Sequence, residues 1–182
     1  KSKTCSVNRR ASRTAPFAIT GMGKGIMKMI FRNGERSDSA DLIEMRVEYL
    51  KEDWGTLTEE QETAIRKQLP DYMERHLGGN LTAYVAEENG RLAGTVLMMV
   101  VEKLAGPSAI NGKTGTLMNV YVRPEYRKLG LGAKLVTMAL EDARRKELCH
   151  VDLHATVQGK KLYEYLGFQK SESHYTPMVF EL

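Results

Sequence analysis

The sequence has little of several features that would point to particular classes of protein. Its two cysteines, Cys5 and Cys149, are too few for a disulfide framework and do not form the paired pattern of a zinc site. The longest apolar run is the short stretch 96–101, whereas a membrane-spanning helix needs about 20 apolar residues. We therefore expect a protein of a reducing compartment, the cytoplasm, with no metal site and no membrane partner.

Acidic residues are absent from the first 25 positions, which hold six lysines and arginines. Setting those six aside leaves 21 basic and 23 acidic residues, so the net charge of +4 comes from the leading segment. A body this close to neutrality gives no reason to expect a nucleic-acid partner. We interpret residues 1–26 as a basic leader or a non-native extension, because Met27 or Met29 could start a natural protein. Residues 27–182 form a chain of ordinary length for one domain.

Apolar periodicity and turn residues predict strands and helices along this body. Its order is strand, helix, helix, three strands, helix, strand, helix and two strands. The predicted segments are 27–32, 39–54, 58–77, 82–88, 91–102, 117–122, 131–146, 150–156, 159–166 and, for the last two strands, 169–182.

The most informative stretch, 116–146, changes from a buried strand to an amphipathic helix across a turn that contains Gly130 and Gly132. The first amides of a helix have no partners within it and carry the positive end of its dipole. Glycines let the backbone turn tightly, so that several amides can point at one anion. The stretch therefore predicts a phosphate or pyrophosphate site, beside which Arg127 and Lys128 add positive charge.

The spacing Arg-x-x-Gly-x-Gly of this turn resembles the acetyl-CoA signature of the GNAT superfamily of N-acetyltransferases. A second match follows at 159–168, where Leu162-Tyr163 and Gly167-Phe168 resemble that superfamily's Leu-Tyr-x-x-x-Gly-Phe segment. The resemblance covers residues 29–182 or so. It implies an α/β fold of the α+β type, with a mixed, mostly antiparallel sheet that is flanked by helices and splayed between its fourth and fifth strands. The predicted order of elements agrees with that fold.

The resemblance also implies how acetyl-CoA, the expected co-substrate, is held. Residues 120–122 would bond to the pantetheine and the acetyl carbonyl through their backbone, and the amides of 128–133 would hold the pyrophosphate. A backbone N–H near Val120 would stabilise the oxyanion formed during transfer. Many relatives carry Asn at the position of Thr156 and Ala at that of Gly159. The implied cofactor-binding residues are Val120, Tyr121, Val122, Arg127, Lys128, Leu129, Gly130, Leu131, Gly132, Ala133, Thr156 and Gly159.

Tyr163 matches the superfamily tyrosine that protonates the departing thiolate, a role that suits a phenol close to the sulfur. Thr116 stands where histone acetyltransferases place a glutamate base, so that base is absent. An amine near pKa 10 needs some group to accept its proton.

Our candidate base is His154, which strand alternation places on the same side as Asp152 and Thr156. Glu102, His174 and a chain of water molecules are alternatives, and a purely structural histidine is a competing interpretation.

We therefore predict transfer of an acetyl group from acetyl-CoA to a primary amine, by direct attack in a ternary complex. The acceptor is a small molecule or a peptide, expected between the helical pair (especially Tyr49 and Trp54) and the loop 104–112. A non-catalytic acyl-CoA sensor is the first alternative. A dinucleotide-binding domain is less favoured, because Leu135 replaces the third glycine of that fingerprint. Both a monomer and a homodimer stay open.

Overall fold

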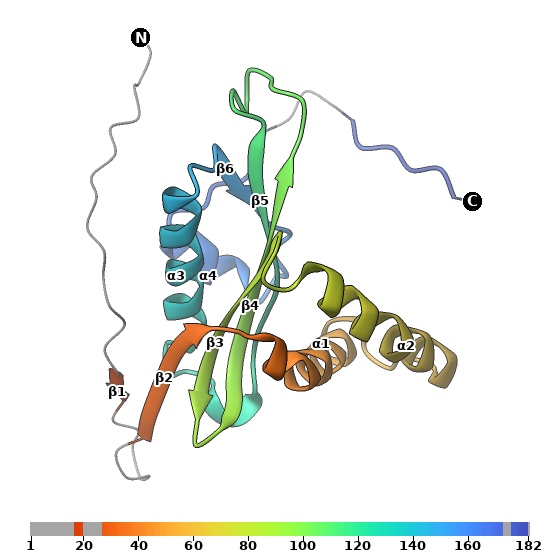
Figure 1. The fold of residues 1–182 in the computed structure, drawn as a ribbon, viewed down its shortest axis with the longest axis vertical. Coiled ribbons are helices and arrows are strands. Elements are labelled where there is room, and N and C mark those ends of the chain that lie inside the picture. The colour runs from red at the N-terminus through yellow and green to blue at the C-terminus, as the bar shows by residue number, and fades with distance from the viewer. Residues whose placement is uncertain (1–16, 20–26, 173–175, 182) are drawn as a thin grey trace.

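The computed structural model describes residues 17–19, 27–172 and 176–181. Its sheet consists of six strands in the order β1-β2-β3-β4-β5-β6, with antiparallel neighbours except for the parallel pair β5 and β6. Helices α3 and α4 cover one face, and α1 and α2 cover the other (Figure 1). The predicted mixed, mostly antiparallel sheet flanked by helices is thus confirmed. The strands are β1 (Phe17–Ile19), β2 (Met27–Asn33), β3 (Leu81–Glu88), β4 (Arg91–Glu102), β5 (Lys113–Val122) and β6 (His150–Asp152), and the helices are α1 (Ser39–Trp54), α2 (Glu59–His76), α3 (Leu131–Arg145) and α4 (Lys160–Tyr165).

Local sequence signals explain where several elements begin and end. Thr58 accepts a hydrogen bond from the amide of Gln61, whose side chain accepts one from the amide of Thr58, and this capping box begins α2. Asn89 and Gly90 have φ angles of 52° and 80°, as a type I′ hairpin turn requires, so β3 and β4 pair directly. These predicted features are confirmed.

Two apolar clusters lie on the two faces of the sheet. Leu131, Leu135 and Ala139, three buried residues of α3, pack with strand residues in the first cluster. Leu42 of α1 and Met73 of α2 belong to the second cluster. The helices on both faces therefore hold the sheet, and with it the end of β5, in a fixed place.

Strand β5 carries a bulge close to its carboxyl end. Thr95 of β4 lies opposite Tyr121, but Leu97 lies opposite Met118, so β5 has one more residue than β4 between these pairs. Asn119, within that interval, has a φ of 50°, which is typical of such a bulge.

The parallel pairing with β6 ends before the bulge, because it joins only 114–116 of β5 to 150–152. Beyond Thr116, no described strand pairs with this edge of β5. The predicted splay between the fourth and fifth strands of the body, which are β5 and β6 here, is confirmed.

Three details of the sequence-based prediction differ from the structure. The predicted strand 150–156 ends at Asp152. The two predicted final strands are wrong for 169–172 and 176–181, which contain no strand; 173–175 and 182 lie outside the described residues. The first of these pieces lacks an alternating apolar pattern, and Pro177 cannot donate to a ladder. Conversely, the leader contributes β1, whose three residues pair with β2.

No helix in the described part of the chain is long and apolar enough to cross a membrane.

Candidate functional site

A cavity of about 650 Å³ lies beside the unpaired end of β5 and the beginning of α3. Eleven of the twelve predicted cofactor-binding residues line it, and Leu129 is the exception. The structure therefore brings these residues together at one cavity from segments that are far apart in the chain. The residues that line the cavity are Tyr49, Glu52, Asp53, Val120, Tyr121, Val122, Tyr126, Arg127, Lys128, Gly130, Leu131, Gly132, Ala133, Thr156, Val157, Gln158, Gly159 and Leu162.

The turn before α3 presents a run of free backbone amides to this cavity. Lys128 and Gly130 have φ angles of 63° and 77°, so the chain alternates between left-handed and other conformations there. None of the amides of 128–133 donates a hydrogen bond to a described residue. Successive amides in such a turn make a concave anion site, which the dipole of α3 reinforces. The site has the geometry and the charge to bind a phosphate group.

Gly130 is required for its backbone conformation rather than for space. A β-carbon at this position would meet no atom within 4 Å, yet the φ of 77° disfavours any side chain. At Gly132 a β-carbon would lie 3.5 Å from a methyl group of Leu162, which is ordinary contact.

Arg127 lies at the cavity but does not present a free charge to it. Its Nε donates to the carbonyl oxygen of Val122 at 2.9 Å, and its Nη2 donates to the carboxylate of Glu52. Its guanidinium also lies 5.7 Å from the centroid of the Tyr121 ring. The hydrogen bond to Glu52 raises the pKa of Arg127, and burial opposes that shift. The positive charge of Arg127, which we expected beside a phosphate, is thus balanced by Glu52 of α1.

Thr156, Gly159 and Tyr163 form a tight group at the beginning of α4. The hydroxyl of Thr156 accepts a hydrogen bond from the amide of Gly159 at 3.1 Å. A β-carbon on Gly159 would lie 3.1 Å from the ring of Tyr163 and 3.2 Å from the hydroxyl oxygen of Thr156. Glycine at this position therefore lets the ring of Tyr163 pack closely below the wall of the cavity.

Tyr163 is only 9% exposed and packs edge-to-face on Phe168, with ring centroids 5.8 Å apart. It is not among the lining residues, although Gly159 and Leu162 beside it are. Burial, with a smaller contribution from the phenol of Tyr49, raises the pKa of Tyr163 to about 12. The phenol therefore keeps its proton throughout the neutral range.

His154 does not lie where strand alternation placed it. Strand β6 ends at Asp152, and His154 follows as an exposed residue that does not line the cavity. The alternation argument is wrong here, because the chain leaves the sheet before it reaches His154. Glu102 is also exposed and lies 3.7 Å from Lys113, and His174 lies outside the described residues.

The acidic residues of the site come from α1, and the sequence-based prediction did not include them. Glu52 and Asp53 line the cavity, and the hydroxyl of Tyr49 donates to Asp53 at 3.2 Å. A signal was present, since Tyr49, Glu52 and Asp53 are three and four residues apart and share a helix face. Trp54, named with Tyr49 as an acceptor contact, is 77% exposed and does not line this cavity.

Comparison with known proteins agrees with this architecture. A curated relative, glucosamine 6-phosphate N-acetyltransferase of Trypanosoma brucei brucei, is 31% identical over 101 residues, or 55% of this chain and 66% of that protein. The chain thus spans slightly less than two thirds of that relative's length. A GCN5-related N-acetyltransferase from Ralstonia eutropha JMP134 is 26% identical with a TM-score of 0.72, over 82% of this chain and 98% of that one. A predicted acetyltransferase from Clostridium acetobutylicum, crystallised with acetyl-CoA, has the same fold at 18% identity, with a TM-score of 0.71 over 83% of this chain and 96% of that one.

The profile of the acetyltransferase (GNAT) family matches residues 40–168. That range begins in α1, ends just after α4 and contains the whole cavity wall. The expected N-acetyltransferase is thereby confirmed at the level of the family, and the chain belongs to the acetyltransferase (GNAT) family.

Proposed function

We propose that this protein transfers an acetyl group from acetyl-CoA to a primary amine of a small molecule. The observation that carries the proposal is the run of unpaired amides at 128–133, which opens on the cavity beside the unpaired edge of β5. A pyrophosphate would accept from these amides, and an extended pantetheine arm would lie along 120–122. Acetyl-CoA, when bound, supplies an acetyl group as a thioester.

Tyr163 is the proposed general acid. In the reaction the amine nitrogen forms a bond to the acetyl carbon, the carbon–sulfur bond breaks, and the sulfur needs a proton. The phenol of Tyr163, with its pKa raised to about 12, retains a proton for this step at neutral pH. The phenolate that results is reprotonated from solvent before the next turnover.

Asp53 is the proposed acceptor of the proton that the amine loses, in place of His154. Both Glu52 and Asp53 line the cavity, but Glu52 is bonded to Arg127. Asp53 has no described cation within 4 Å and accepts only from Tyr49. A carboxylate at the cavity wall with no cation in contact can accept a proton, directly or through water.

The identity of the acceptor amine has to be found by testing candidate amines. The curated relative acts, by its name, on glucosamine 6-phosphate. We propose this amino-sugar phosphate as the first acceptor to test, together with other small primary amines and short peptides.

The experiment has a binding step and a turnover step. Acetyl-CoA at about 100 times its Kd stabilises a folded protein by about 2.7 kcal/mol, which would raise the melting temperature by about 5–10 °C. NAD at the same concentration should leave it unchanged. Release of the CoA thiol should then depend on the added amine.

Two results would contradict the proposal. Stabilisation by NAD and not by acetyl-CoA would indicate a dinucleotide site. Binding of acetyl-CoA without thiol release for any amine of the panel would favour the non-catalytic sensor.

A further inference from the structure

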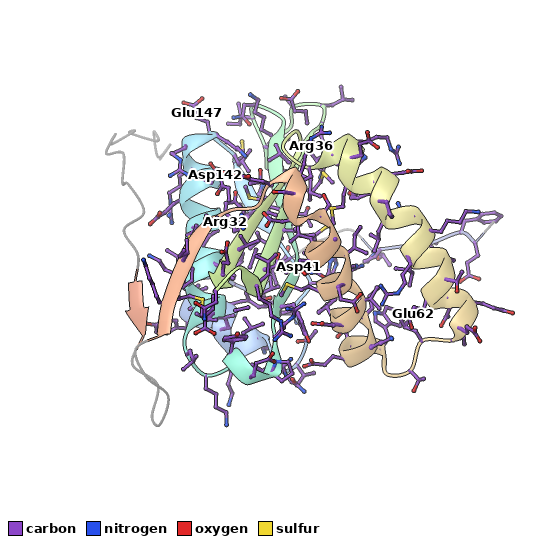
Figure 2. The ribbon with its side chains drawn as sticks, turned by 60° about the horizontal axis from the view of Figure 1, so that its bottom comes forward. Arg32, Arg36, Asp41, Glu62, Asp142 and Glu147 are labelled. Carbon is purple, nitrogen blue, oxygen red and sulfur yellow. The ribbon has the colours of Figure 1, made fainter. Side chains whose placement is uncertain are left out.

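Arg46 differs from the other buried or half-buried arginines in the described part of the chain, because it has no carboxylate partner. Four arginines are in this class, and three of them have a carboxylate oxygen within 3.2 Å. Arg46, on α1, has no carboxylate within 4 Å in the described part of the chain. The contrasting case is Arg32, labelled in Figure 2, whose guanidinium lies 2.7 Å from carboxylate oxygens of both Asp38 and Glu87. The three paired arginines are Arg32 with Asp38, Arg66 with Glu44, and Arg123 with Glu48.

The groups nearest to Arg46 do not balance its charge. Its Nη1 lies 3.4 Å from the side-chain oxygen of Asn119, a long contact to a neutral group. Its guanidinium carbon lies 5.5 Å from the centroid of the Tyr49 ring. Burial lowers the pKa of Arg46, and the phenol of Tyr49 and the more distant carboxylate of Asp53 oppose this shift without reversing it, so the surroundings disfavour the charged form. A half-buried cation with no carboxylate in contact costs free energy that a bound anion would recover.

Asn119 adds a second donor without an acceptor. It is 3% exposed at the bulge of β5, and its side-chain nitrogen has no hydrogen-bond partner among the described residues. Buried polar groups are normally paired, so an orphan amide beside an uncompensated guanidinium is unusual. Together the two side chains provide an excess of donors, with no carboxylate of the described residues within hydrogen-bond distance of either.

Arg46 and Asn119 lie next to residues that line the cavity. Tyr49, which lies under the guanidinium, lines the cavity, as does Val120, the residue after Asn119. Arg46 belongs to α1, on one face of the sheet, whereas the free amides belong to the beginning of α3 on the other face (Figure 1). An anion at Arg46 would therefore be distinct from the phosphates proposed for the turn, and would lie on the side from which α1 borders the cavity.

We propose that Arg46 binds an anionic group, a phosphate or a carboxylate, on the amine acceptor and so selects acceptors that carry negative charge. The inference rests on the proposed acetyl transfer and names the class of its acceptor. The planar guanidinium suits both anions because its N–H groups match the oxygens of either in pairs.

The first test measures anion binding without turnover. Inorganic phosphate and acetate are titrated by calorimetry into protein saturated with CoA, so that the turn amides are already occupied. We expect at least one anion to bind the parent protein and to bind Arg46→Gln at least tenfold more weakly. Which anion binds distinguishes a phosphate acceptor from a carboxylate acceptor.

Arg75→Gln is the matched control, because Arg75 on α2 is exposed and donates only to the carbonyl of Asp71 among the described residues. It should bind the anions as the parent protein does. Absence of binding to the parent protein, or equal binding to Arg46→Gln, would overturn the inference.

The second test compares matched amines at saturating acetyl-CoA. Glucosamine 6-phosphate is paired with glucosamine, and an amino acid is paired with its amide. We expect the parent protein to favour the anionic member of a pair in kcat/KM, and Arg46→Gln to reduce that preference by about tenfold to a hundredfold. Arg46→Lys, which keeps the charge but not the planar fork, should restore part of it.

Failure of this inference is distinguishable from failure of the proposed function. Normal acetyl-CoA binding with no preference for the anionic amines would overturn the role of Arg46 alone. If the parent protein does not bind acetyl-CoA, the proposed function itself is refuted.

Discussion

The guanidinium of Arg127 donates to the carboxylate of Glu52, which lies 75 positions earlier in the chain on α1. This contact ties the first helix to the turn before α3 and neutralises the charge of the arginine. The amides of 128–133, rather than the side chain of Arg127, are therefore the donors that we expect a phosphate to meet.

Glu52→Gln should release the charge of Arg127. Because the pair is partly exposed, its interaction is about 0–1 kcal/mol, and the freed cation should tighten acetyl-CoA binding by about twofold to fivefold. Calorimetry at low and high salt is the measurement, and the gain should shrink at high salt. Glu62→Gln, which breaks ion pairs with Lys51 and Arg66 away from the cavity, is the control. Unchanged or weaker binding in Glu52→Gln would mean that Arg127 does not approach the phosphates.

Gly130→Asp should abolish stabilisation by acetyl-CoA. The carboxylate would place negative charge at the free amides, and the φ of 77° would be strained for a side chain. Gly90→Asp is a matched control, since Gly90 has a φ of 80° and a β-carbon there would likewise meet no atom within 4 Å, but it lies in the hairpin between β3 and β4. Comparable acetyl-CoA affinities in the two variants would refute the phosphate site.

Tyr163→Phe removes one hydroxyl and keeps the packing of the ring on Phe168. We expect kcat to fall by about 10²–10⁴-fold with acetyl-CoA affinity nearly unchanged, as for loss of a positioned general acid. Tyr165→Phe, on the exposed side of the same helix, should retain full activity. Because the pKa of Tyr163 is about 12, the parent enzyme should show no loss of rate from this group between neutrality and pH 10. Full activity in Tyr163→Phe would mean that another group protonates the thiolate.

Deleting residues 1–26 tests the proposed domain boundary. The described part of this segment contributes only β1, three residues that form the edge of the sheet beside β2. We expect acetyl-CoA affinity to be unchanged and the shortened protein to bind a cation exchanger more weakly, because six basic residues are lost. A matched deletion of 1–16, which keeps β1, separates the effect of that strand from the effect of charge. Loss of folded protein after either deletion would place the boundary earlier in the chain.

The sequence predicts the elements that local chemistry defines. Glycine and asparagine at 89–90, the capping pair Thr58 and Gln61, and the apolar face of α3 each act within a few residues, so each could be recognised without tertiary contacts. The turn before α3, which we propose to bind phosphate, belongs to the same class, since Gly130 within it supplies a left-handed φ.

The features that escaped prediction depend on contacts between distant segments. Whether β6 continues to His154 depends on how far β5 offers it an edge, and that pairing joins only 114–116 and stops before the bulge at Asn119. The balance of charge at Arg127 depends on Glu52, and the lack of balance at Arg46 depends on which side chains surround it. Neither relationship can be read from the spacing of residues along the chain.

The hydrogen bond from the hydroxyl of Tyr84 on β3 to the carboxylate of Asp142 on α3, at 2.6 Å between buried groups, supports a prediction about stability. Burial pushes the pKa of Asp142 up, but hydrogen bonds from Lys146 and Tyr84 outweigh it, so the pKa lies below its ordinary value. A carboxyl group with a lowered pKa in the folded state stabilises the fold above its unfolded pKa, and this contribution is lost as the pH falls through the folded value.

Tyr84→Phe should therefore reduce the free energy of unfolding by about 1–3 kcal/mol at pH 7. Denaturant unfolding across a pH series is the measurement, and the difference from the parent protein should shrink below about pH 4, where Asp142 takes up a proton in the unfolded chain. Lys146→Met, which removes a second donor to Asp142 and leaves the exposed Arg145, should show the same pH dependence. A loss of stability in Tyr84→Phe that stayed constant down to the lowest pH would assign it to packing rather than to the carboxylate.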